Sequence, residues 1–237
     1  FVASFASGPA HAQQPPASSG IAPAYKLFRF DEDYRSFGIP ETAAFLDALK
    51  YVPLGDDPGW FLSFGGEIRE RFEYYSHPGL GLQGQSPNAY LLQRPLLHAD
   101  LHAGDYVRAF VQLGSHLAPW KDFAAPPYLD ALDVQQAFVD LRLPLGITAD
   151  PVLRVGRQEM AYGSQRLVSI RDAPNVRRNF DGVRLGGTVG DVRIDLFATR
   201  PVQQRSGVFD DSGDTTQGFW GAYATMPLNV VSGGGLD

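Results

Sequence analysis

Trp60–Tyr75, the stretch WFLSFGGEIRERFEYY, decides the fold because its side chains change character at every second position. Apart from Glu70, one set of alternate positions is apolar or glycine: Leu62, Phe64, Gly66, Ile68, Phe72 and Tyr74. The positions between them are polar or glycine: Ser63, Gly65, Glu67, Arg69, Arg71 and Glu73. Such alternation is typical of a β-strand whose two faces meet different surroundings. The stretch also exceeds the roughly 9–11 residues that a tilted strand needs to cross a bilayer.

The same alternation recurs along the rest of the chain. Further strands are predicted near residues 91–101, 107–113, 131–143, 152–161, 181–189, 192–200 and 215–227, which gives eight candidate strands with residues 60–75. Long links are predicted near residues 77–88, 117–130, 162–180 and 201–214, and short ones near 102–105, 144–151 and 190–191. Alternating short and long connections are typical of an outer-membrane β-barrel.

The sequence therefore predicts an all-β fold, an antiparallel transmembrane β-barrel. A soluble β-sandwich remains an alternative, because its strands also alternate when one face packs and the other meets water. A sandwich requires neither the alternation of link lengths nor strands of about ten residues, since soluble strands typically have about five or six.

Composition narrows the class of protein further. The chain has 26 Gly, 18 Pro, 16 Phe, 10 Tyr and 3 Trp, which favours strands joined by turns. Cysteine is absent, which excludes disulfides and thiolate metal sites. The formal net charge is -6, and of 20 basic residues only Lys26, Lys50 and Lys121 are lysine. Arginine suits bidentate recognition of carboxylates, whereas the acidic balance disfavours nucleic acid as a partner.

The N-terminal part departs from the strand pattern. Residues 1–12, FVASFASGPAHA, end in the small-residue pattern AHA and are predicted to be the remnant of a signal peptide. A disordered N-terminus is the alternative. Residues 13–59 are predicted to be a periplasmic linker with a short helix that opens at Glu41 and is ended by Pro53. Residues 60–237 are predicted to form the partial barrel domain.

Four segments carry more than a pattern, namely residues 51–75, 93–115, 132–146 and 153–185. They resemble successive strands of the alginate export family of bacterial outer-membrane proteins, and the blocks GRQE, YG, RL and RNFDGVRL are the most specific parts. The resemblance covers about residues 50–237. It implies a monomeric barrel of about 18 strands, whose arginine-rich lumen passes a polyuronate chain outward. Since only about eight strands are found, we expect an N-terminal fragment of such a barrel, with two unpaired edges.

Candidate substrate-binding residues follow from the charge of a polyuronate. The polymer carries one carboxylate per sugar, so a pore that conducts it needs weak cationic sites at several places along its wall. Alternation places Arg69, Arg71, Arg94, Arg108, Arg142 and Arg193 on predicted inner faces. The stretch Gly156–Leu185 holds six arginines against three acids, and it adds Arg157, Glu159, Arg177, Arg178 and Arg184 to the candidates.

The orientation of the strand near 152–161 rests on the cost of burying charge in lipid. An arginine facing lipid near the middle of the membrane costs roughly 2–4 kcal/mol, so Arg157 and Glu159 are predicted to face inward. Gln158 is then predicted to face outward and Arg154 to lie on the lipid side, unless a bulge at Gly156 reverses part of the strand.

Two further predictions carry open alternatives. The link 162–180 is predicted to fold into the lumen and to bring Arg171, Arg177 and Arg178 to the path; a solvated outer loop is the alternative. All these arginines could instead neutralise acids on the same faces, which are Glu67, Glu73, Asp100, Asp140, Glu159 and Asp195.

Other chemistry is weakly signalled. No G-x-S-x-G, H-E-x-x-H or phosphate-loop motif occurs, and the five histidines show no metal-ligand spacing. Asp210, Asp211 and Asp214 could hold Ca²⁺ loosely, but they lack the ordered ligand ladder of a known loop, so a polar turn is the favoured interpretation. We therefore expect no enzyme, no cofactor and no metal.

These observations predict a pore in the bacterial outer membrane for an anionic polysaccharide such as alginate. Its expected partners are the polysaccharide or its oligosaccharides, outer-membrane lipid and periplasmic export components. Two alternatives remain open: an uptake porin for small organic anions, and a secreted all-β carbohydrate-binding protein or lyase.

Overall fold

The computed structural model describes residues 25–32, 34, 45–78, 86–144, 146 and 149–227. The predicted signal peptide, residues 1–12, lies outside the described residues, as does part of the linker that follows it. Neither helix in the described ranges is long and apolar enough to cross a membrane.

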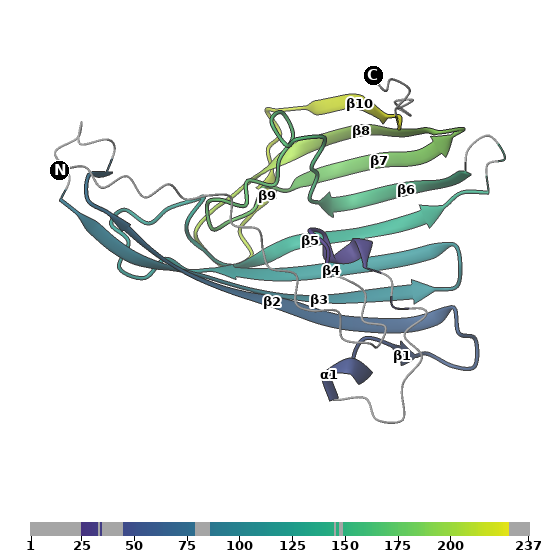
Figure 1. Ribbon diagram of the computed structural model, residues 1–237, viewed down its shortest axis with the longest axis horizontal. Helices are drawn as coiled ribbons and strands as arrows, with labels where there is room; N and C mark the ends of the chain where they lie inside the picture. Colours follow the sequence, from purple (N-terminus) through teal and green to yellow (C-terminus); the bar gives the residue numbers. More distant parts are fainter. Residues whose placement is uncertain are drawn as a thin grey trace, which may run out of the picture.

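One antiparallel sheet dominates the fold (Figure 1). Its strands follow chain order: β1 (Val52–Pro53), β2 (Trp60–Tyr75), β3 (Asn88–Ala103), β4 (Val107–His116), β5 (Asp130–Arg142), β6 (Ala149–Gln158), β7 (Phe180–Val189), β8 (Val192–Gln203) and β10 (Phe219–Thr225). The short strand β9 (Ser212–Gly213) pairs with the end of β8. The sheet runs from β1 at one edge to β10 at the other, so the described strands form an open sheet that is not closed into a barrel, with the two edges expected of a fragment.

All eight predicted strands are present, and β10 differs most from its predicted bounds. It begins at Phe219 because the residues before it form a polar turn. The Asp214 carboxylate accepts hydrogen bonds from the Thr216 backbone N–H at 2.9 Å and from the Gln217 side chain at 2.7 Å.

The predicted helix before the sheet is shorter than expected at its C-terminal end. Helix α1 spans Phe45–Ala48, whereas Val52 and Pro53 pair with β2. Pairing with the sheet therefore replaces the last helical turn that the sequence pattern predicted.

The two faces of the sheet differ in burial as well as in chemistry. The face that we call apolar carries, among others, Phe64, Ile68, Phe72, Leu97, Val111, Val139, Val155, Val183 and Leu196, all of them exposed. Ile68 is 79% exposed and Leu97 is 69% exposed. The opposite face, which we call polar, carries Arg94, His98, Asp100, Gln112, Asp140, Arg154 and Asp195, all of them buried. In a soluble protein the apolar side chains would be buried and the charged ones exposed.

Two segments cover the polar face. The first contains the 3-10 helix η1 (Arg29–Asp31), drawn in purple across β4 and β5 in Figure 1. Its Phe30 ring lies 5.9 Å from the ring of Phe110 on β4 and 5.3 Å from that of Phe138 on β5, in edge-to-face geometry. The second, which we call the inward loop, consists of residues 159–179 between β6 and β7.

The loop of residues 204–214 fills a gap in the sheet beside β5. Strand β6 pairs with β5 only along Ala137–Arg142. Beyond this point Leu132 forms a bridge with Val208 and accepts a hydrogen bond from the Phe209 N–H at 2.9 Å. The sheet therefore continues through this loop, while the chain after β6 turns onto the polar face.

Candidate functional site

Five charged side chains meet where the inward loop contacts β2 and β3. We call them the Arg94 cluster: Glu67, Arg69, Arg94, Asp172 and Arg177. Arg94 is 1% exposed and lies 3.0 Å from Glu67 and 2.9 Å from Asp172. Arg177 Nε donates to Asp172 at 2.8 Å, and Arg69 Nη1 lies 3.2 Å from the other oxygen of Asp172. Asp172 is thus held by three guanidinium groups, and these charges lower its pKa against the effect of burial.

Two asparagines fix the inward loop over the polar face. The Asn175 side-chain amide donates to the carbonyl oxygens of Gln93 and Leu117, each at 3.0 Å. The Asn179 amide donates to the carbonyl of Gln135 at 2.8 Å. The segment therefore lies against the polar face of the sheet and brings Arg177 into the Arg94 cluster, while its place inside a lumen stays a prediction.

Glu159 faces the polar side of the sheet, as predicted. It is 1% exposed, accepts a hydrogen bond from Gln135 at 2.9 Å and lies 3.9 Å from Arg177. Burial raises the pKa of Glu159 to about 7, although Arg177 and the Gln135 hydrogen bond act in the opposite direction. The carboxyl group therefore changes its charge near neutral pH.

A second group of arginines forms ion pairs within the sheet itself. Arg108 donates two hydrogen bonds to the Asp100 carboxylate, at 2.7 and 2.6 Å. Arg184 donates to Asp195 at 2.9 Å, and Arg193, with a side chain 63% exposed, lies 3.6 Å from the same carboxylate. These arginines neutralise acids on their own face, which is the alternative that the sequence left open.

The prediction that Arg154 lies on the lipid side was wrong. Arg154 is 8% exposed, donates two hydrogen bonds to Asp140 at 2.7 and 2.8 Å, and stacks over the rings of Phe30 and Phe138 at 4.0 and 3.7 Å. The register explains this, because Asp140, Arg154 and Arg184 are direct neighbours across β5, β6 and β7. A polar row that spans three strands favours one common face.

The predicted sides of Arg157 and Gln158 were wrong for the same reason. Alternation continues through Gly156, so Gln158, which is 0% exposed, shares the side of Arg154. Arg157 shares the side of the exposed Val155 and is neutralised at the loop end of the sheet. It donates to Asp181 at 2.8 Å and lies 3.4 Å from Asp133.

The remaining candidates differ in their partners. Arg71 lies 2.7 Å from Glu73 and donates to the Ala173 carbonyl of the inward loop. Among the described residues, Arg142, Arg171 and Arg178 have no carboxylate within ion-pair distance. Burial lowers the pKa of Arg178, and the charge of Arg171 acts in the same direction.

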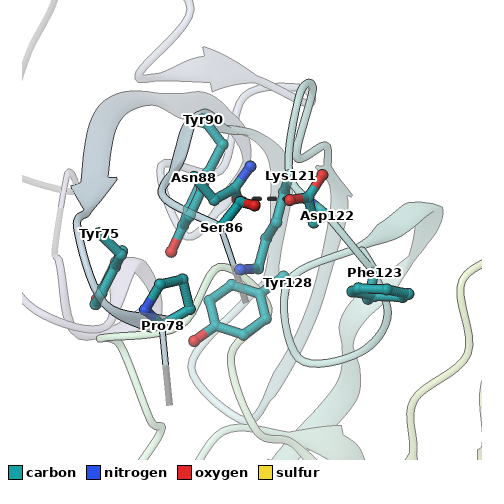
Figure 2. Close-up of a pocket in the computed structure, with 9 residues that line it drawn as sticks. All are labelled: Tyr75, Pro78, Ser86, Asn88, Tyr90, Lys121, Asp122, Phe123 and Tyr128. Carbon is teal, nitrogen blue, oxygen red and sulfur yellow. Dashed lines mark hydrogen bonds between the residues drawn. The ribbon is translucent and has the colours of Figure 1, made fainter. Parts of the chain in front are cut away.

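Sequence reasoning missed a cleft of 430 Å³ at the loop end of β2 and β3 (Figure 2). Lys121 Nζ lies 4.0 Å from the ring centre of Tyr90 and 4.3 Å from that of Tyr128, while Tyr75 stacks parallel to Tyr90 at 6.0 Å. Phe123 at its rim is 88% exposed. The aromatic residues and the lone lysine of the link 117–130 were the available signal, but they become a cleft only through pairing with β2 and β3.

Together these features define a class: an all-β protein with one antiparallel sheet, ionised side chains on its covered face and apolar side chains on its open face. The chain belongs to the alginate export family, because the model of that family, described as alginate export, matches residues 61–228. This confirms the resemblance seen in the sequence. The family is a transport family of the outer membrane, which implies a role without catalysis. No curated protein and no solved structure matches the chain.

Proposed function

We propose that the chain forms part of the wall of an outer-membrane β-barrel pore that passes an anionic polysaccharide, such as alginate, along its polar face. The observation that carries the proposal is the inverted sheet: Ile68 and Leu97 are open on one face, while Arg94 and Asp140 are buried on the other. In a barrel wall the apolar face contacts lipid and the polar face lines an aqueous interior. Closure needs further strands between the edges at β1 and β10.

The candidate residues then have two roles. Arg142, Arg171 and Arg178 carry charge that no described carboxylate compensates, so they can attract a polyuronate directly. The other candidates on the polar face are paired within the protein: Arg69, Arg71, Arg94, Arg108, Arg177, Arg184 and Arg193, with Glu159 beside Arg177. Arg157 lies on the apolar side and is paired with Asp181, so it takes no part in this binding. Paired arginines bind a passing carboxylate weakly, because it must compete with a resident one. Weak binding at several places is what conduction requires.

The partners follow from the two faces and the two ends of the sheet. Outer-membrane lipid contacts the apolar face, and periplasmic export components deliver the polymer at the end with the short turns. The cleft around Lys121 lies at the end with the long loops, where the polymer leaves. Its ring faces and its ammonium group suit a sugar that carries a carboxylate.

Planar-bilayer recordings of the full-length protein test this function. We expect anion-selective conductance that polyuronate oligomers block, and in the double variant Arg171→Ala/Arg178→Ala we expect anion selectivity and block to fall several-fold. Arg200→Ala is the matched control. This arginine lies four residues after the exposed Leu196 and therefore shares the apolar side of β8.

Each rival function has its own outcome in these recordings. Block by small carboxylates alone would indicate an uptake porin for organic anions. A full-length protein that is soluble without detergent would indicate a secreted carbohydrate-binding protein. If the double variant and the control had equal effects, the inward loop would not line the transport path.

A further inference from the structure

Three aspartates gather where the loop of residues 204–214 meets β5. Asp133 of β5, Asp210 and Asp211 each offer a carboxylate oxygen, and these oxygens all lie within 4.8 Å of one another. We call the three residues the aspartate cluster. Asp133 is 5% exposed, and the other two are half-buried. Three carboxylates at such distances repel each other strongly unless a cation or protons compensate their charge.

A fourth carboxylate, that of Asp130, feels the charge of all three and has one buried oxygen without a hydrogen bond. Asp130 is 1% exposed, and its Oδ1 is buried without a hydrogen bond. The charges that act most strongly on Asp130 are those of Asp211, Asp133 and Asp210. The nearest opposite group is His116, whose Nδ1 lies 3.9 Å from Asp130 Oδ2, beyond hydrogen-bond distance. Asp210 also has a buried oxygen, Oδ1, without a partner.

The protein supplies few positive charges here. Arg157 lies 3.4 Å from Asp133, but its Nε donates to Asp181 at 2.8 Å, so this guanidinium is shared. Asp211 accepts a hydrogen bond of 2.6 Å from the Arg205 backbone N–H, while the Arg205 guanidinium donates to the backbone carbonyl of Asp210. Among the described residues, one shared guanidinium, that of Arg157, is the only cationic group paired with a carboxylate of the aspartate cluster. Burial raises the pKa of Asp211 to about 6, and Asp133 and Asp210 add to this effect.

We propose that the aspartate cluster, with Asp130 beside it, binds Ca²⁺. Its donors are all oxygens, which suit a hard cation, and Ca²⁺ accepts six to eight of them in flexible geometry, with carbonyls and water completing the shell. Mg²⁺ fits less well, because it demands a nearly ideal octahedron and gives up its water reluctantly. The ion would tie the loop of residues 204–214 to β5, at the point where β6 has left the sheet.

This site differs from the one that the sequence suggested. Asp214 bonds within its own turn and takes no part in the cluster, whereas Asp130 and Asp133 come from β5, about 80 residues earlier in the chain. The proposal does not depend on the transport function, since binding would occur whichever molecule passes the polar face.

Calorimetric titration of the full-length protein with CaCl₂, after removal of ions with a chelator, tests the proposal. We expect one site with a dissociation constant of roughly 10⁻⁴–10⁻³ M, the range of extracellular calcium modules. The double variant Asp210→Asn/Asp211→Asn should weaken binding at least about tenfold. Asp214→Asn is the matched control in the same loop and should bind as the wild type does.

Any of three results would contradict the calcium site. The wild-type protein could show no heat of calcium binding, the double variant could bind Ca²⁺ as the wild type does, or the wild type could bind Ca²⁺ and Mg²⁺ with equal affinity. If the double variant does not fold, the single variants Asp210→Asn and Asp211→Asn replace it, because each keeps the other carboxylate. The wild-type titration decides whether any calcium site exists, independently of all variants.

Discussion

The arginines of the polar face differ in what their removal would leave behind. Arg154 is buried, bonded twice to Asp140 and enclosed by two aromatic rings. Its loss would leave a buried carboxylate without a partner, and breaking such a pair typically costs about 3–5 kcal/mol. Arg178 has no carboxylate partner among the described residues, so its charge is available to a ligand. The buried pairs hold the structure, and the unpaired cations are the better candidates for guiding a polymer.

Glu159 gives the stability of the protein a pH dependence. Its pKa is about 7 in the folded protein and about 4.3 in an unfolded chain. Between these values the folded state binds the additional proton, so the free energy of unfolding contributed by this group falls as pH rises through the window. The stabilising contribution is fully present below pH about 4.3 and lost above pH about 7.

Glu159→Gln should remove this dependence, because the amide imitates the protonated carboxyl group. We expect the variant to be more stable than the wild type at pH 8 by roughly 4 kcal/mol, since one pKa unit corresponds to about 1.4 kcal/mol. The two proteins should become similar near pH 4. Denaturant unfolding of the refolded protein at several pH values measures this difference. A difference that does not change between pH 4 and pH 8 would show that Glu159 is not a buried, titrating group.

At the scale of the element, β6 and β7 depend on a pair of facing glycines. Gly156 has a φ of +133° and lies opposite Gly182, which has a φ of +154°. A Cβ at Gly156 would collide with the carbonyl oxygen of Ala137 on β5. The close approach of β6 to β5 therefore requires glycine at position 156, because glycine is unstrained at positive φ and has no side chain.

Gly156→Ala should destabilise the sheet by roughly 1–3 kcal/mol from backbone strain, and more from the collision with β5. Gly218→Ala is the control, because a Cβ there meets nothing within 4 Å. The unfolding of both variants in detergent or lipid measures the difference. A Gly156→Ala protein as stable as the control would mean that β5 and β6 lie further apart than described.

The sequence predicted the strands well because alternation is a local property. It predicted the side of Arg154 and Arg157 wrongly because a shift of one residue moves every side chain of a strand to the other face. The decisive information was the register with Asp140 and Arg184, which depends on partners in other strands. An inward path of the link 162–180 was one of two predicted alternatives, but its anchoring by Asn175 was not predicted, since that amide reaches carbonyls from two distant segments.

The sites were harder to predict than the strands. The cleft around Lys121 and the aspartate cluster each join a strand to a loop far away in sequence. The sequence signalled Asp210 and Asp211 but not their partner Asp133, because spacing along the chain carries no signal for a residue on a distant strand. The eleven candidate residues were found by charge and alternation, and their roles in binding stay predictions.

At the scale of the whole molecule, the open sheet has its polar side covered and its apolar side exposed. Ile68, Phe72 and Leu97 are each more than half exposed on the apolar face, whereas the inward loop and the segment around Phe30 cover the polar face. In water so much exposed apolar surface would favour association with other molecules. In a bilayer the same surface is stabilised, because hydrocarbon replaces water around it.

Spin-label accessibility in lipid bilayers tests this central claim most directly. The 237 residues contain no cysteine, so labels can be placed singly at neighbouring positions such as Ile68 and Arg69 on β2, or Val111 and Gln112 on β4. We expect labels at Ile68 and Val111 to be accessible to oxygen dissolved in lipid and protected from a water-soluble relaxing agent, and labels at Arg69 and Gln112, on the covered polar face, to be protected from the lipid-dissolved oxygen. Labels at Ile68 and Val111 that meet only the water-soluble agent, or no difference between neighbours, would contradict the account.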